Sequence, residues 1–176
     1  MILAIDPGWK CGWAVVEPKT ARLVALGVFT SQPDKAIAKS TDRARRVAAL
    51  GAELAQVRDA HVCTAIAAES MLCYGAPNAV VPQVLVWGML TRLAAEIGVG
   101  LVEVIAKDWQ HAVTPGVKKI SYDKVKRALA VLAGRRLELI PKDLRTHALD
   151  AVGIGAYAAL RSPRRIVSTM KGAHVS

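Results

Sequence analysis

The sequence predicts an α/β fold: a five-stranded mixed sheet, with three antiparallel strands plus two parallel strands, flanked by helices. Three apolar segments with short connections open the chain, a pattern typical of an antiparallel meander. After them, helical patterns alternate with two short apolar runs. A run that is apolar at nearly every position suits a strand covered by helices on both faces.

The meander is predicted to consist of strands at residues 1–6, 11–17 and 23–30. The first strand ends in Asp6, and a Pro-Gly turn follows it directly. Asp-Pro-Gly is common turn chemistry, because an Asp side chain bonds nearby backbone amides. Asp6 is therefore either a turn residue or a functional acid, and the rest of the chain has to decide.

Two helices and the fourth strand are predicted in the middle of the chain. The first helix covers residues 41–60, with Ser40 as its N-cap. The fourth strand lies within residues 64–70, where an apolar run ends in Glu69, and residues 72–81 form a loop. The second helix covers residues 82–98 and carries more apolar residues than one buried stripe needs, so we expect it to form a subunit interface. The alternative is a helix that is simply central in the core.

The C-terminal half is predicted to begin with the fifth strand, at residues 99–106, and a basic loop at 107–119. A helix follows between Ser121 as its cap and Gly134 as its stop, and then an extended segment. The last helix covers residues 142–162. The prediction is one domain over residues 1–162 and a basic, flexible tail over 163–176.

Composition limits the functions that the chain can have. A net charge of +10 on 176 residues favours a polyanionic partner, either nucleic acid or an anionic membrane surface. No apolar run reaches the roughly 20 residues that a membrane-spanning helix needs, and we expect no signal peptide, because Asp6 would interrupt its apolar region. Cys11, Cys63 and Cys73 show no metal-site spacing and indicate reduced thiols in a cytosolic protein.

Four ionisable residues are candidates for one site: Asp6, Glu69, His147 and Asp150. Asp150 lies in an almost wholly apolar stretch, where a lone carboxylate is costly to bury unless it is paired or bound to metal. His147 is three residues earlier, on the same helical face. Clustered carboxylates repel one another, and divalent cations remove that penalty. Two cations about 4 Å apart support phosphodiester cleavage, which together with the basic surface indicates a nuclease.

Four motifs carry a resemblance to a known family: "AIDPG" at Asp6, "AAES" at Glu69, "AVTPG" near position 114, and "HALDA" around Asp150. In these motifs the chain resembles the RuvC family of Holliday junction resolvases, within the RNase H-like superfamily. The resemblance implies an RNase H-like fold and a homodimer that binds four-way junction DNA. It also implies symmetric nicking of two strands with Mg²⁺ or Mn²⁺, two ions per active site.

The resemblance assigns roles to the four candidates. Asp6, Glu69 and Asp150 match the family's metal-binding acids, and His147 falls where many members carry aspartate and some carry histidine. Imidazole is a better ligand for manganese than for magnesium, so we expect manganese to support cleavage at least as well as magnesium. His147 could instead orient water, move a proton, or take no part.

Six residues are predicted to contact DNA: Tyr74, Trp109, Lys118, Lys119, Lys124 and Arg127. Lys118 and Lys119 precede a helix start, where they would meet phosphates, although any single lysine could be an ordinary solvated charge. Family members often carry an aromatic residue where this chain has Leu72, and Tyr74 could take its place by stacking on an unpaired base. Trp109 and Gln110 resemble more divergent, often phage-borne, relatives.

Two other functions remain open from the sequence. One is an RNase H-like nuclease that acts on RNA–DNA hybrids or other branched nucleic acids, and the other is a non-catalytic junction-binding protein. No residue pattern points to a branch-migration motor as a partner. The sequence also does not favour a bacterial cell over a phage-infected host. The expected compartment is the cytoplasm in both cases.

Overall fold

A five-stranded sheet forms the centre of the computed structural model, which describes residues 1–70, 77–116 and 121–169. The strand order is β3-β2-β1-β4-β5. β1 pairs with β2 and β2 with β3 in antiparallel fashion, whereas β1–β4 and β4–β5 are parallel. The predicted mixed sheet is therefore confirmed. The strands are β1 (Ile2–Asp6), β2 (Lys10–Val16), β3 (Leu23–Thr30), β4 (Ala65–Glu69) and β5 (Leu101–Val104).

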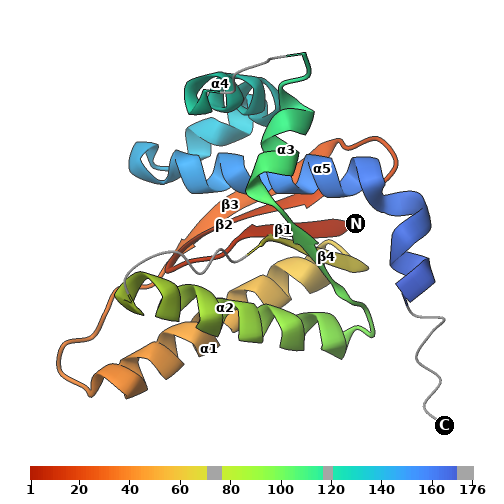
Figure 1. Ribbon diagram of the computed structural model, residues 1–176. Helices are drawn as coiled ribbons and strands as arrows, with labels where there is room; N and C mark the ends of the chain where they lie inside the picture. The colour runs from red at the N-terminus through yellow and green to blue at the C-terminus, as the bar shows by residue number, and fades with distance from the viewer. Residues whose placement is uncertain (71–76, 117–120, 170–176) are drawn as a thin grey trace, which may run out of the picture.

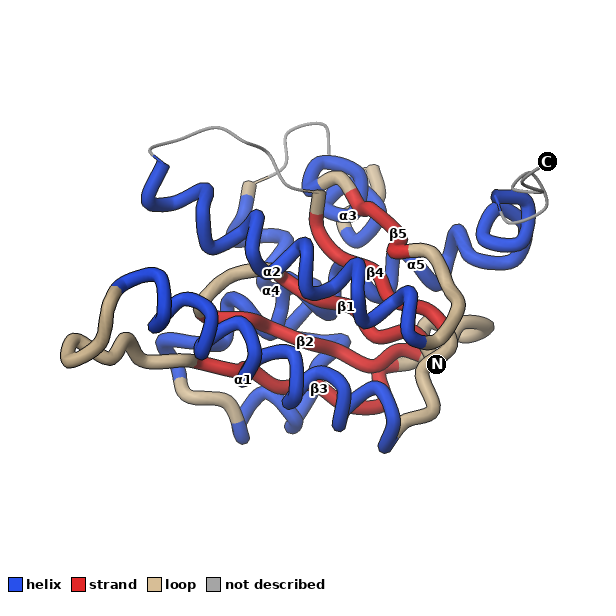
Figure 2. The backbone as a smooth tube through the Cα atoms, turned by 90° about the horizontal axis from the view of Figure 1, so that it is seen from below, coloured by secondary structure: helices blue, strands red, loops and turns tan. Residues whose placement is uncertain are grey.

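Helices cover both faces of the sheet (Figure 1). On one face, α1 (Lys39–Ala60) and α2 (Pro77–Glu96) lie side by side, as Figure 2 also shows. On the other face, α5 (Arg145–Thr169) runs across β1, β2 and β3. The helices α3 (Ala106–Val113) and α4 (Tyr122–Ala133) pack against α5, and two 3₁₀ helices, η1 (Gly134–Leu139) and η2 (Lys142–Leu144), connect α4 to it.

Strand alternation divides the apolar residues between two cores. In β1, Ile2 and Ala4 face the α5 side, and Leu3 and Ile5 face the α1–α2 side. The same alternation in β4 sends Ala65 and Ala67 to the α5 side and Ile66 and Ala68 to the other. Because successive side chains of a strand point to opposite faces, the last residue of each strand, Asp6 and Glu69, belongs to the α5 side.

Gly12 permits a close approach between the sheet and α5. It pairs with Asp6 in the β1–β2 ladder. A Cβ atom built on Gly12 would overlap the backbone carbonyl of His147. Only a residue without a side chain allows the first turn of α5 to lie this close to β2, and this contact brings α5 over the end of β1.

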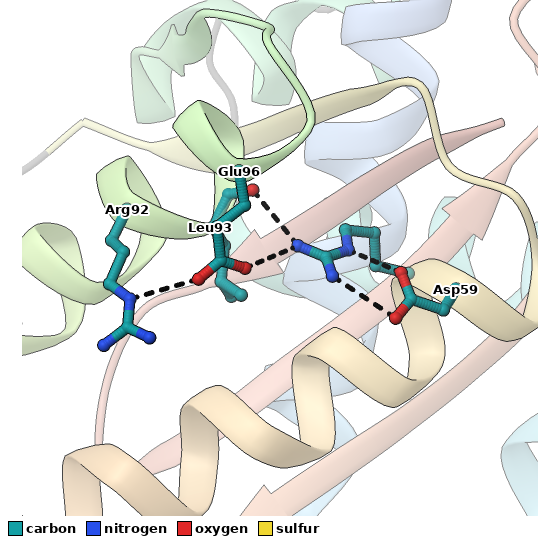
Figure 3. A network of polar contacts seen from close by, with 5 residues as sticks. Asp59, Arg92, Leu93 and Glu96 are labelled. Atoms are coloured by element: carbon teal, nitrogen blue, oxygen red, sulfur yellow. Dashed lines mark hydrogen bonds and ion pairs between the residues drawn. The ribbon is translucent and has the colours of Figure 1, made fainter.

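Arg58 joins the C-terminal ends of α1 and α2 (Figure 3). Its guanidinium donates to the carboxylates of Asp59 and Glu96 and to the carbonyl of Leu93. The side chain is only 10% exposed, and Arg92 adds a second ion pair to Glu96. A planar guanidinium with three acceptors holds the two helices in one orientation.

Two helices begin earlier than predicted. α1 starts at Lys39 after Ala38, so Ser40 lies within the first turn and is not the cap. α2 starts at Pro77, so Pro82 lies inside the helix, where it removes one backbone hydrogen bond. The N-terminal end of α2 therefore includes residues that the sequence assigned to a loop.

Three further segments differ from the prediction. The first part of the predicted loop at 107–119 forms α3 together with Ala106, because Trp109 is buried and gives that segment an apolar face. The segment predicted as extended after Gly134 forms η1. α5 continues to Thr169, into the predicted tail, and the domain boundary at residue 162 stays a prediction. Ser121 and Gly134 bound α4 as expected.

Within residues 1–70, 77–116 and 121–169, no helix has both the length and the apolar character that crossing a bilayer requires.

Candidate active site

Asp6 and Glu69 end two neighbouring parallel strands. The last pairs of the β1–β4 ladder include Ile5 with Ala68, which places Asp6 and Glu69 one residue further along, side by side. The strand alternation directs both toward α5. The carboxyl ends of parallel strands are where open α/β sheets place their ligands, so this edge is the candidate active site.

His147 reaches this edge from the first turns of α5. Its Nδ1 lies 2.7 Å from Oδ2 of Asp6. A carboxylate only accepts, so Nδ1 donates and the other ring nitrogen, Nε2, is left free in the neutral imidazole. The hydrogen bond with Asp6 raises the pKa of His147 above its usual value, although partial burial opposes it.

Two tryptophans hold Glu69. The indole Nε1 of Trp109 donates to Oε2 of Glu69 at 3.0 Å, and Nε1 of Trp87 donates to the backbone carbonyl of the same residue at 3.2 Å. Burial raises the pKa of Glu69, the bond from Trp109 opposes that shift, and the charge of Asp6 adds to it.

Tyr122 holds Asp150. Its hydroxyl lies 2.8 Å from Oδ1 and 2.7 Å from Oδ2 of the carboxylate. Burial raises the pKa of Asp150 to about 7, the hydrogen bond from Tyr122 opposes this, and the charges of Asp6 and Glu69 raise it further. Burial and the neighbouring Asp150 also raise the pKa of Tyr122.

The three carboxylates and the imidazole thus influence one another electrostatically. Carboxylate oxygens with one imidazole form a donor set that suits Mg²⁺ or Mn²⁺. In the part of the chain that the structure describes, no group of three such side chains is already arranged to hold a metal ion. Each carboxylate is instead bound to a neighbouring donor: His147, Trp109 or Tyr122. The donor chemistry fits a divalent cation, and binding requires these side chains to rearrange.

No family model and no curated protein matches the chain. Among solved structures, the chain is similar to RuvC of Thermus thermophilus in complex with a Holliday junction substrate, with a TM-score of 0.70 and 22% identity. That match covers 97% of this chain and 95% of the other. A second Thermus thermophilus RuvC structure has a TM-score of 0.66 at 20% identity, covering 97% and 96% of the two chains. The chain has the RuvC fold. The fold expected from the four motifs is thereby confirmed.

In this RuvC fold, one of the predicted DNA contacts is corrected. Trp109 is 1% exposed and lies in the core on the α5 side of the sheet, so its indole is not available to stack on a base. The hydrogen bond to Glu69 satisfies the only polar atom of the ring, so the indole is buried in this core without an unpaired donor. Trp109 holds Glu69 of the acidic site from within the core, and its ring is not exposed for contact with DNA.

The other predicted contacts divide between described and undescribed residues. Lys124 and Arg127 are exposed on α4. Tyr74, Lys118 and Lys119 lie outside the residues that the structure describes.

Tyr122 and Trp87 are site residues that the sequence reasoning missed. Tyr122 follows directly after the predicted cap Ser121, and nothing in the local pattern connects it to Asp150, which is 28 residues away. The only available clue was an aromatic residue at the first position of a helix in the basic part of the chain.

Proposed function

We propose that this chain is a Holliday junction resolvase: an endonuclease that nicks two strands of a four-way DNA junction symmetrically. The observation that carries the proposal is the hydrogen bond between Asp6 and His147, which lies at the edge of the sheet where β4 ends in Glu69. The RuvC structure with TM-score 0.70 is bound to a Holliday junction substrate, which supports the same substrate class here.

Asp6, Glu69, His147 and Asp150 are the residues proposed to hold two divalent cations, Mg²⁺ or Mn²⁺. The chemistry that such a pair supplies is activation of a water and stabilisation of the charge on the leaving 3′ oxygen. The raised pKa values of Glu69 and Asp150 support this assignment, because uncompensated negative charge at this edge is costly until cations are present.

The chain's own residues orient these groups. Asp6 holds the Nδ1–H of His147, which leaves Nε2 free either to bind a cation or to accept a proton from water. Trp109 fixes one oxygen of Glu69, and Tyr122 fixes Asp150. On α4, the exposed Lys124 and Arg127 are proposed to contact phosphates next to the site, as are Lys118 and Lys119 in the preceding segment. Tyr74 is proposed to stack at the junction centre.

A homodimer is proposed through the face formed by α1 and α2. A shallow groove between the two helices is lined mostly by small and apolar residues, among them Ala48, Gly51, Ala52, Leu85, Gly88 and Met89. An isologous dimer presents two equivalent sites, which suits a junction with near two-fold symmetry and two strands to nick. The cytoplasm is the proposed compartment, because chromosomal and phage junctions form there.

The proposal is tested by incubating wild-type and Asp6→Asn protein with a synthetic mobile four-way junction and Mn²⁺. Wild-type protein is expected to nick opposite strands at matching positions, whereas Asp6→Asn binds the junction and does not nick it. A linear duplex and an RNA–DNA hybrid are run beside the junction. Faster cleavage of the hybrid would identify a hybrid-cutting nuclease, and junction binding without nicking by the wild type would identify a non-catalytic binding protein.

A further inference from the structure

The hydroxyl of Tyr122 lies almost equally far from both oxygens of Asp150, at 2.8 Å and 2.7 Å. A hydroxyl carries one proton, so it is shared between two acceptors instead of belonging to one of them. The place between the two oxygens of a carboxylate is also where a cation sits when it binds both of them. In this structure Tyr122 occupies that place.

The Tyr122 ring is held where it is by its own helix. Nζ of Lys126, one turn later on α4, lies 4.5 Å from the ring centroid. α4 itself is anchored through Val125, Leu129 and Ala133, which are buried in the core that it shares with α5. The hydroxyl is therefore fixed relative to Asp150 by two packed helices, although Tyr122 is 39% exposed.

Cations differ in how they use a carboxylate. Ca²⁺ takes about six to eight oxygen ligands at flexible geometry and readily binds both oxygens of one carboxylate. Mg²⁺ requires near-octahedral geometry, keeps several waters, and uses one or two carboxylates. Restricting a carboxylate to a single oxygen therefore lowers the affinity for Ca²⁺ more than the affinity for Mg²⁺.

We propose that Tyr122 is a specificity-determining residue of the cation site: its hydroxyl occupies the place between the two oxygens of Asp150, so that a cation binds this carboxylate through a single oxygen, which disfavours Ca²⁺ relative to Mg²⁺. This inference rests on the proposed function only in taking Asp150 as a cation ligand. Tyr122 acts through Asp150 and is a positioning residue, not a catalytic one.

The test is calorimetric titration of the DNA-free, full-length protein with Ca²⁺ and, separately, with Mg²⁺. Tyr122→Phe is expected to bind Ca²⁺ about tenfold more tightly, as loss of one hydrogen bond to a charged group allows, and to change its Mg²⁺ affinity by less than about threefold. Tyr157→Phe is the matched control. The Tyr157 hydroxyl donates to Asp108 at 3.2 Å and to none of the four proposed ligands, so its removal is expected to leave both affinities unchanged.

Two results overturn the role of Tyr122 alone: an unchanged ratio of Ca²⁺ to Mg²⁺ affinity, or a shift in that ratio that persists when Asp150→Asn is added. Absence of binding of either cation to the wild type overturns the cation site of the proposed function, and the role of Tyr122 with it. Circular dichroism checks the fold of each variant. If Tyr122→Phe unfolds, Tyr122→Met also lacks the hydroxyl and carries the same expectation.

Discussion

Nδ1 of His147 donates a hydrogen bond to Oδ2 of Asp6 across 2.7 Å, joining residues 141 positions apart in the chain. The two side chains are partly shielded, with 33% of the His147 side chain and 19% of the Asp6 side chain exposed. A histidine that donates one ring nitrogen to a carboxylate has a defined tautomer and presents its other nitrogen outward. This contact is the reason to expect an influence of His147 on the choice of metal.

His147→Asp is expected to shift the metal preference of nicking toward Mg²⁺. The change replaces an imidazole nitrogen by a carboxylate oxygen, which is the harder ligand and the one that Mg²⁺ favours. Nicking rates at equal concentrations of Mg²⁺ and Mn²⁺ give the ratio for each protein, and we expect the ratio of Mg²⁺ to Mn²⁺ rates to rise at least about threefold. A ratio identical to that of the wild type would exclude His147 as a ligand.

Trp109→Phe is expected to weaken cation binding about 10- to 100-fold, the usual cost of losing a group that orients a metal ligand. The substitution removes the donor to Oε2 of Glu69 and leaves most of the ring volume in place. Calorimetric titration with Mn²⁺ measures the effect.

Trp87→Phe is the control for this variant, because Trp87 donates to the backbone carbonyl of Glu69 and not to its carboxylate. It is expected to change the Mn²⁺ affinity by less than about threefold. If both variants weaken Mn²⁺ binding equally, the loss comes from packing and not from the carboxylate.

Asp150→Asn is expected to stabilise the metal-free protein above neutral pH. Burial raises the pKa of Asp150 to about 7 from an ordinary value of 3.8, so the folded state holds its proton more tightly than the unfolded state. Stability therefore falls as pH rises from about 4 to about 7 and stays low above that range.

Asparagine does not ionise, so the variant avoids this loss. The gain in unfolding free energy is expected to be small at pH 4 and to reach up to about 4 kcal/mol at pH 8. Urea unfolding in the presence of a chelator measures it at both pH values. The exposed Asp143→Asn is the control, and an equal gain at pH 4 and pH 8 would contradict the role of ionisation.

Gly88→Glu is expected to convert the proposed dimer into a monomer. Gly88 is exposed on α2, and a Cβ atom there would meet nothing within 4 Å in the single chain. Replacing a helical glycine also favours the helix itself, so the isolated subunit is not harmed. Light scattering after size exclusion gives the mass, and circular dichroism checks the fold.

The matched control is Val131→Glu, which adds the same charge at a residue that is 82% exposed on α4. It is expected to leave the mass unchanged. A wild-type protein that is already monomeric at micromolar concentration would contradict the proposed interface. A Gly88→Glu variant that stays dimeric would contradict it as well.

The two strand-terminal acids were predictable because of their local pattern. Apolar runs that end in Asp6 and Glu69 predict both the strand and the position of the acid at its end. The alternation of side chains along each strand then determines which face of the sheet the acid lies on. His147 and Asp150 were predictable as a pair from helical spacing.

The partners of these acids were not predictable in the same way. Trp109, Ala112 and Val113 mark one face of a helix, but the segment has only eight residues and several charged or polar ones. A stretch this short is easily taken for a loop. The contact of Tyr122 with Asp150 depends on how α4 crosses α5. That crossing is set by packing in three dimensions and leaves no trace in local spacing.

Gly12, which pairs with Asp6, has no functional group of its own, yet it determines the geometry of the whole site. The gap between β2 and α5 is set there by main chain against main chain, and no rotamer change can widen or narrow it. A single added methyl group at residue 12 would lift the start of α5 and draw the imidazole away from the strand end. A protein could thus keep every acidic and basic side chain discussed above and still lose its chemistry, so surveys of inactive variants should include this position beside the charged ones.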